Sequence, residues 1–407
     1  MFKNWSAKLS LVKVKLALTY VIILLTDFSF IFAKMIVGIN ICGAVKENGE
    51  RPGDLIINYF TRIAIKHPEH AFVFITDGPV ENLIEKTKNT SIIIVEPRPK
   101  RTLFWKFWYN YKLESIVRKQ QIAVLIYPDP ICSLRSKTPQ FLLINELPFL
   151  HGGSMPKTYF RFYKKHTLQF LQKAKRIATV SDFLKKEIAD KYKIDEQQLD
   201  IIYSSIDKRY MPVPFDKKEQ TKEKYAEGKE YFLYAGEINA DKNLIVLLKA
   251  FSFFKKRQKS NMQLLILSES LNSGYFSTSL KTYKYRHEVK LLLDLPVEEQ
   301  AVITASAYSF VYPSLYEPFP KKIIEALQCE VPVIANHMDV VIEICADAVL
   351  YTNTNNFEEI ADKMMLLFKD EKKRNEFILK SSKQALQYSL DKTADLLWQS
   401  IVKTTAV

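Results

Sequence analysis

Short apolar runs alternate with longer segments that carry one apolar face along most of the chain. Each run ends in polar or turn residues, which is typical of a buried strand that leads into a loop. In the first half these runs cover residues 35–40, 70–78, 91–97, 123–130, 140–148 and 176–183. The segment 55–67 (LIINYFTRIAIKH) between two of them predicts a helix. Strands that alternate with helices predict an α/β fold built on parallel sheets.

The same alternation restarts in the second half, after a charged, proline-containing segment at 199–230 that we interpret as a linker. Further strands, the first followed by a helix, are predicted within residues 231–251, 262–270, 289–296 and 309–314. We therefore predict two doubly wound domains, 35–208 and 209–385, with a binding cleft between them. Residues 386–407 are expected to form a C-terminal helix that could cross back to the first domain.

Residues 1–34 differ from the rest of the chain. The stretch 16–33 has the length of a bilayer span but contains Asp27, and several lysines precede it. By the positive-inside rule those lysines would stay in the cytosol and the rest of the chain would be exported, which conflicts with any function that uses a cytosolic nucleotide. We therefore favour an extension upstream of a start at Met35, or a segment lying on the membrane, over a spanning anchor. A removed signal peptide is the third alternative.

Composition narrows the classes of partner. The 407 residues are 47% hydrophobic, enough for a large core, and the net charge is +14. Such charge favours a polyanionic partner, which could be nucleic acid, an anionic membrane surface or a phosphorylated substrate. The cysteines lack CxxC spacing, which argues against zinc and a disulfide framework and favours the cytoplasm: Cys42, Cys132, Cys329 and Cys345. The six histidines lack ligand spacing and no DxD pair ends a strand, so we expect no metal.

Two carboxylates stand out in residues 314–335 (SLYEPFPKKIIEALQCEVPVIA). The pattern predicts a strand before this stretch, a loop, a helix that begins near Pro320, and a second strand at 331–335. Glu317 then lies in the loop at the carboxyl end of a strand, where ligands of parallel sheets bind, and Glu325 lies about two helical turns along. Both could instead be solvated charges.

Several stretches in order resemble the GT-B glycosyltransferases, in particular the retaining enzymes of glycosyltransferase family 4. These stretches are HPEHAFVF, INELPFLHG, AKRIATVSDFLKKEIADKY, YFLYAGEINADKN, EEQAVITASAYSFVYPSLYEPF, VPVIA and YSLDKTADLL. The resemblance covers residues 35 to about 400. It implies two Rossmann-like domains that face each other across a cleft, with a nucleotide-diphospho-sugar held by the second domain.

The resemblance also implies roles for single residues. Glu325 would bind the ribose hydroxyls, Glu317 would lie near the donor sugar, and Lys242 would neutralise charge on the leaving diphosphate. Gly236 would border the donor, and Gly53, less firmly Gly49, would form a glycine loop that approaches the phosphates. Glu317 and Lys242 are therefore the candidate catalytic residues. No cofactor is expected, because the nucleotide-sugar is a co-substrate.

The chain also departs from the pattern of the family it resembles. Glu237 stands where a polar or basic residue usually follows the glycine, and it would repel a diphosphate unless its side chain turns away. Pro318 and Pro320 have no amide proton to offer to phosphate. Lys321 and Lys322 could replace the lost positive charge, or could simply face solvent.

A second departure lies in the first domain, where Asn145 and Glu146 replace a His-Asp pair. His151, six residues on from Asn145, is a weak substitute for the missing imidazole and could equally be structural. These three residues are our candidates for the acceptor side of the cleft. The losses leave open a second function, that of a catalytically impaired pseudo-enzyme acting as a partner or scaffold.

Aromatic and basic residues are interleaved in residues 101–119 and 157–176. Helices of this composition can rest on an anionic bilayer, although the same aromatic faces could pack on the sheet. Single-stranded nucleic acid is a third partner for such surfaces, but no nucleic-acid-binding motif supports it. We therefore expect a cytoplasmic hexosyltransferase at the inner face of the membrane, which extends a lipid-linked or polysaccharide glycan and binds no nucleic acid.

Overall fold

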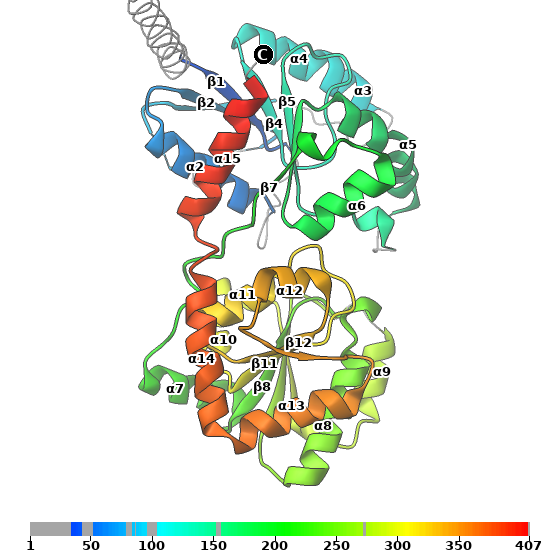
Figure 1. The fold of residues 1–407 in the computed structure, drawn as a ribbon, viewed down its shortest axis with the longest axis vertical. Coiled ribbons are helices and arrows are strands. Elements are labelled where there is room, and N and C mark those ends of the chain that lie inside the picture. The colour runs from blue at the N-terminus through cyan, green and yellow to red at the C-terminus, as the bar shows by residue number, and fades with distance from the viewer. Residues whose placement is uncertain are drawn as a thin grey trace, which may run out of the picture.

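Two α/β domains stacked end to end make up the computed structural model (Figure 1). It describes residues 34–42, 52–78, 84–85, 87–95, 104–151, 156–271 and 274–405. The expectations for the N-terminal segment 1–34, apart from Lys34, and for Gly49 lie outside the described residues. Within the described ranges, no helix has the length and apolar character needed to cross a bilayer.

The N-terminal domain is a seven-stranded parallel sheet with the strand order β3-β2-β1-β4-β5-β6-β7. The strands are β1 (Ile36–Asn40), β2 (Ala71–Thr76), β3 (Thr90–Ile94), β4 (Val124–Tyr127), β5 (Gln140–Ile144), β6 (Arg176–Thr179) and β7 (Leu199–Ile201). The helices are α2 (Pro52–Lys66), α3 (Trp105–Phe107), η2 (Trp108–Lys112), α4 (Leu113–Lys119), η3 (Pro148–Leu150), α5 (Lys157–Lys173), α6 (Asp182–Tyr192) and η4 (Glu196–Gln198).

The C-terminal domain is a six-stranded parallel sheet with the order β10-β9-β8-β11-β12-β13. The strands are β8 (Tyr231–Ala235), β9 (Gln263–Ser268), β10 (Val289–Leu293), β11 (Ser309–Tyr312), β12 (Val333–Asn336) and β13 (Leu350–Thr352). The helices are α7 (Phe215–Ala226), η5 (Ala240–Lys242), α8 (Leu244–Gln258), α9 (Gly274–Lys281), η6 (Arg286–Glu288), α10 (Val297–Ala305), α11 (Lys321–Gln328), α12 (Asp339–Cys345), α13 (Phe357–Lys369) and α14 (Glu371–Ala385). The last helix of the chain, α15 (Leu390–Thr405), packs on the N-terminal domain.

The central strands are continuous apolar runs, without alternating polar residues, because both of their faces are buried. Every residue of β4, β5, β8, β9 and β11 is buried, because helices cover both faces of each sheet. Strand β12 ends on the partly exposed Asn336, where the chain leaves the core at the carboxyl edge of the sheet. The expected α/β class with two doubly wound domains is thus confirmed.

The segment that we interpreted as a linker is more structured than predicted. Residues 199–230 contain β7, which extends the first sheet, and α7, which packs on the second domain against α10. The interpretation was wrong for these two elements because α7 buries only a narrow face, Thr221, Lys222 and Ala226. A mostly solvated helix has a polar sequence that is hard to distinguish from a linker.

Helix α15 returns to the N-terminal domain and lies beside α2 (Figure 1). Arg62 of α2 donates to Asp391 at 2.6 Å, and Lys66 contacts Asp395 at 2.7 Å. His67 stacks on Trp398 with ring centroids 4.3 Å apart. The chain therefore crosses between the domains twice, at 202–214 and at 386–389.

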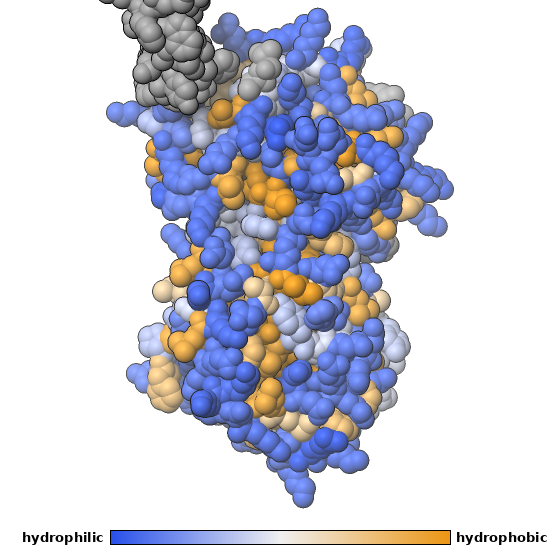
Figure 2. All heavy atoms as spheres, in the orientation of Figure 1, coloured by the Kyte–Doolittle hydropathy of each residue, from blue (hydrophilic) through white to orange (hydrophobic). Residues whose placement is uncertain are grey.

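The two crossings are bonded to each other. The Ile206 amide donates to the Tyr388 carbonyl at 3.3 Å, and the Thr393 hydroxyl donates to the Tyr203 carbonyl at 2.9 Å. The rings of Tyr203 and Tyr388 meet edge to face at 5.8 Å. Both segments run along one side of the molecule, where its outline narrows between the domains (Figure 2).

Candidate active site

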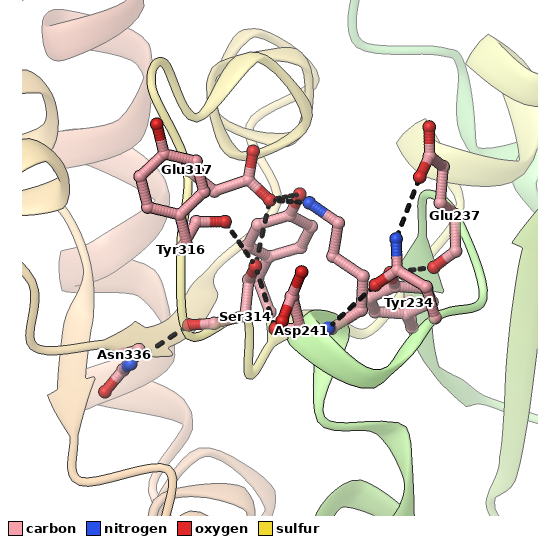
Figure 3. A network of polar contacts seen from close by, with 10 residues as sticks. Tyr234, Glu237, Asp241, Ser314, Tyr316, Glu317 and Asn336 are labelled. Atoms are coloured by element: carbon pink, nitrogen blue, oxygen red, sulfur yellow. Dashed lines mark hydrogen bonds and ion pairs between the residues drawn. The ribbon is translucent and has the colours of Figure 1, made fainter. Parts of the chain in front are cut away.

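Glu317 and Lys242 form an ion pair at the carboxyl edge of the C-terminal sheet (Figure 3). Lys242 ends η5, in the loop after β8, and Glu317 lies in the loop after β11, the strand next to β8. Their side chains are only 15% and 10% exposed. The sheet order therefore brings together two candidate catalytic residues that are 75 positions apart in sequence.

The carboxylate of Glu317 has two further hydrogen-bond donors. The Tyr312 hydroxyl donates to Oε1 at 2.6 Å and the Ser314 hydroxyl at 2.9 Å, so this oxygen accepts from three groups. The other carboxylate oxygen points away from these donors in Figure 3. Glu317 thus keeps a fixed orientation while one oxygen remains directed out of the network.

Backbone contacts hold the two loops against each other. The Leu315 amide donates to the Asp241 carbonyl at 2.8 Å, and the Asn336 side chain donates to the Ser314 carbonyl at 2.9 Å. The Asn239 side chain caps the short helix η5 by accepting from the Lys242 amide. The positions of Lys242 and Glu317 are therefore fixed by the loops themselves.

Gly236 occupies a backbone position that other residues avoid. Its φ is +147°, and a Cβ there would lie 2.9 Å from the Tyr234 hydroxyl, which donates to the Glu237 carbonyl. The Glu237 carboxylate accepts from the Asn239 side chain at 2.9 Å. Glu237 is exposed, and this contact turns its charge to one side of the loop.

Glu325, Lys321 and Lys322 form a charged group on α11. Glu325 is 1% exposed and lies 2.9 Å from the Lys322 ammonium and 3.5 Å from that of Lys321. Glu325 Oε1 is buried and accepts no hydrogen bond from any described residue. The Lys321 ammonium lies 3.5 Å from this oxygen, so Oε1 keeps the capacity to accept a hydrogen bond from a ligand hydroxyl.

Glu146 follows β5 of the other domain and lies near the charged side chains of the C-terminal loops. Partial desolvation raises the pKa of its carboxyl, the carboxylates of Glu237 and Glu317 raise it further, and Lys242 opposes them. The residue is nevertheless exposed on one side, as is Asn145 next to it. Acidic groups of both domains therefore lie near the Lys242 ammonium, Glu146 from the first domain and Glu237 and Glu317 from the second.

His151 contacts the second domain directly. Its ring stacks on Tyr316 with centroids 3.7 Å apart, and its Nε2 contacts the Glu187 carboxylate on α6. Burial raises the pKa of the Tyr316 hydroxyl. His151 thus lies where the two domains meet, stacked on the residue that precedes Glu317.

Two further contacts connect the domains. The Ser181 hydroxyl, which caps α6, donates to the Pro318 carbonyl at 2.7 Å. Glu343 of α12 accepts from the Asp182 amide at 2.8 Å and from the Phe183 amide at 3.2 Å. A carboxylate at the positive end of a helix is a favourable pairing, and it ties α6 to the second domain.

Sequence reasoning placed one residue wrongly and missed several others. Gly53 is the second residue of α2, so it lies in the first turn of a helix and not in a loop. The missed residues are Tyr312, Ser314, Asn336 and Glu343. Ser314 is the first residue of the quoted stretch 314–335 and Tyr312 lies two residues before it, at the end of β11. Two hydroxyl-bearing side chains spaced two apart at a strand end point to the same face of the sheet, and that spacing is a usable signal. Among the described residues, no group of three or more His, Cys, Asp or Glu could hold a metal ion.

The fold and the family model agree on the class of protein. Residues 215–384 match the model of the family described as glycosyl transferases group 1. The C-terminal domain, which carries Glu317, Lys242 and Glu325, belongs to that family, and the two facing α/β domains form a GT-B fold.

Relatives and solved structures are consistent with that assignment. The O-antigen chain mannosyltransferase of Salmonella typhimurium is 26% identical over 284 residues, which cover 68% of this chain and 72% of the relative. A glycosyltransferase of Rickettsia africae has a TM-score of 0.70 at 15% identity and covers 92% of this chain and 99% of its own. Anabaena HepE in complex with UDP-glucose has a TM-score of 0.67 at 12% identity and covers 91% of this chain and all of its own. The last two likenesses concern the fold alone.

Proposed function

We propose that the chain is a retaining hexosyltransferase of family 4 that moves a sugar from a nucleotide-diphospho-sugar to a lipid-linked or polysaccharide glycan. The observation that carries this proposal is the pairing of Lys242 with Glu317, next to the helix that bears Glu325. These groups come from separate loops at one sheet edge, where parallel sheets bind their ligands. The family of the C-terminal domain supports the reaction class.

The donor would lie over the loops after β8 and β11. The Lys242 ammonium is paired with Glu317 and would also attract the diphosphate of the donor. It would stabilise the negative charge that develops on the diphosphate as its bond to the sugar breaks. Lys321 and Lys322 add positive charge at the start of α11. Glu325 Oε1 would accept a hydrogen bond from a ribose hydroxyl.

The acceptor would enter from the wall that carries Asn145 and Glu146. Because its pKa is raised, the Glu146 carboxyl holds a proton more readily than an ordinary glutamate and would orient the attacking hydroxyl by hydrogen bonding. His151, packed on Tyr316, would shape the mouth of the cleft. The Salmonella relative acts on an O-antigen chain, which supports a cell-surface glycan as the acceptor and mannose as the first donor sugar to test.

The aromatic-basic helices would hold the enzyme on an anionic membrane. The aromatic side chains of α3 and η2 fall into two groups. Three are buried: Trp105, Trp108 and Tyr109. Phe107 and Tyr111 are 64% and 51% exposed. On α5, Tyr159, Phe160 and Leu168 are exposed among lysines that are also exposed. The buried Trp105 of α3 packs edge to face on Phe162 and Phe170 of α5, so α3 and α5 lie against each other and their exposed aromatic residues belong to neighbouring helices. Membrane association is the role we propose for these exposed residues.

Calorimetry with UDP, GDP and their sugar conjugates tests the proposal. Saturable binding to the full chain that weakens in both Lys242→Ala and Glu325→Ala is the expected result, and it identifies the base. Glycan extension with the preferred donor must then follow. A folded chain that binds none of these nucleotides would support the scaffold alternative, which the missing amide protons of Pro318 and Pro320 favour.

A further inference from the structure

A polar cavity lies at the carboxyl ends of β12 and β13, beside the proposed catalytic pair. Its volume is about 520 Å³, within the range of about 300–1,000 Å³ that is usual for small-molecule sites. Three asparagines, Asn336, Asn353 and Asn355, and Glu359 line it. Glu359 Oε1 accepts from the Asn353 backbone amide, and no hydrogen bond from the described residues reaches its other carboxylate oxygen. Amides both donate and accept hydrogen bonds and a carboxylate accepts them, so this lining suits a ligand with several hydroxyl groups.

The charge of the residues that line this cavity differs from that of a phosphate-binding site. Its residues include Glu359 but neither lysine nor arginine, although the whole chain has a net charge of +14. A diphosphate would face one carboxylate without a compensating cation, which is unfavourable. The chemistry therefore favours a neutral ligand over a nucleotide.

Two rings form part of the wall. His337 and Tyr351 both line the cavity and meet edge to face, with centroids 5.4 Å apart. The Tyr351 hydroxyl donates to the Ala346 carbonyl, which fixes the ring. Rigid aromatic rings beside amides offer apolar contact next to hydrogen bonds, as a sugar ring with its apolar and hydroxyl-bearing faces requires.

Thr352 supplies an independent sign of a missing partner. It is 2% exposed, lines the cavity, and its hydroxyl has no hydrogen-bond partner among the described residues. An unsatisfied buried hydroxyl costs free energy, and a ligand hydroxyl that reached it through a small shift of the cavity wall would remove that cost. Thr354 is a matched case, because it is 1% exposed with an equally unsatisfied hydroxyl but does not line the cavity.

The cavity is connected to the proposed catalytic pair through short contacts. Asn336 donates to the Ser314 carbonyl at 2.9 Å, and the Ser314 hydroxyl donates to Glu317. On the far side, Asn243, next to Lys242, donates to the Thr354 carbonyl at 2.7 Å. The ends of β11 and β13 are separated by one strand, or about 10 Å, which a short oligosaccharide can span.

We propose that this cavity is a subsite for a neutral sugar unit of the acceptor glycan. The subsite lies at the ends of β12 and β13, one to two strands away from β11, whose loop carries Glu317. The assignment to the acceptor rests on the proposed transferase function, whereas the neutral-sugar chemistry rests on the lining alone. The subsite would select glycans by an internal unit and would act by binding, without a part in the reacting atoms.

Saturation-transfer NMR and calorimetry with mannobiose, maltose and lactose test the subsite on the full chain. At least one neutral disaccharide is expected to bind, and His337→Ala and Thr352→Val are expected to weaken it about tenfold. Thr352→Val should keep or raise the melting temperature, because it removes an unsatisfied hydroxyl without changing the side-chain shape. Thr354→Val is the matched control and should bind sugar as the wild type does.

Parallel titrations with UDP and GDP keep the two proposals separate. Lys242→Ala should weaken nucleotide binding and leave disaccharide binding unchanged, and His337→Ala should do the reverse. Disaccharide affinity that is equal in wild type, His337→Ala and Thr352→Val, or absent for all three sugars, would overturn the subsite even if nucleotide binds. Loss of sugar affinity in these variants with no nucleotide binding in the wild type would overturn the transferase and keep a sugar site.

Discussion

Replacing Lys242 by methionine separates its proposed catalytic role from its structural one. Methionine keeps most of the length and apolar volume of the lysine stem but removes the ammonium that contacts Glu317. The Glu317 carboxylate would still accept from the Tyr312 and Ser314 hydroxyls. The variant therefore loses one of three donors to Oε1 and the only positive charge among them.

The expected loss of stability follows from burial. Removing one partner of a fully buried ion pair costs about 3–5 kcal/mol, and exposed pairs contribute about 0–1 kcal/mol. Side chains that are 15% and 10% exposed lie between these limits, and two remaining donors reduce the cost, so we expect about 2 kcal/mol. For a domain of this size that corresponds to a fall in melting temperature of about 4–8 °C.

The effect on transfer should be larger than the effect on stability. A single group that stabilises charge in the transition state is typically worth about 10²–10³ in kcat, so transfer should fall by that factor at temperatures where the variant is folded. Thermal unfolding followed by circular dichroism measures the first quantity, and transfer of a labelled sugar measures the second. Lys224→Met is the control, since its pair with Glu299 is exposed and should contribute little.

Either measurement can refute this reasoning. A melting temperature within about 1 °C of the wild type would mean that the ion pair contributes nothing measurable. A folded variant whose kcat stays within about threefold would assign Lys242 a structural role only.

Three further predictions address other parts of the chain. Gly236→Ala should cost about 1–3 kcal/mol, because φ is +147° and Tyr234 blocks the Cβ, whereas Gly274→Ala, with open space around it, should be neutral in the same thermal assay. The pKa of Glu146 is raised in the folded state, so wild-type stability should decline relative to Glu146→Gln as pH rises through the region above the usual glutamate pKa of about 4.3; unfolding curves that differ equally at all pH values would contradict this. Hydrogen bonds from Arg62 and then Lys66 lower the pKa of Asp391 to about 2, so protection of α15 from hydrogen exchange should decrease slightly as pH falls from about 4 towards 2, because the pair is half-exposed, with a shallower dependence in Asp391→Asn.

Local patterning accounts for most of the strands. Strands β1 to β6 and β8 to β12 coincide with predicted apolar runs, because strands covered on both faces need continuous apolar sequence. Strands β7 and β13 have three residues each, too short for a run to stand out. Helix α7 was not predicted because most of its surface is solvated, so its sequence is charged and lacks a clear apolar face.

The candidate site was predictable where its residues share a motif, and unpredictable where they meet across the fold. Glu317 and Glu325 could be selected from one stretch of 22 residues that ends in a strand. Glu343 accepts hydrogen bonds from backbone amides at the N-terminus of α6, about 160 positions away in the sequence. No local sequence pattern indicates such a pair. The contact between Asn336 and Ser314 likewise depends on strand order.

The paired crossings between the domains limit how the cleft can open. A single connecting segment would let one domain swing and twist freely about the other. Here two segments run side by side and are joined by the Ile206–Tyr388 and Thr393–Tyr203 bonds, so they resist twisting and leave rotation about one axis as the easy motion. Each time the domains closed, Glu146 and Lys242 would then return to the same relative position. By packing on the N-terminal domain, the C-terminal helix would keep that position the same from one closure to the next.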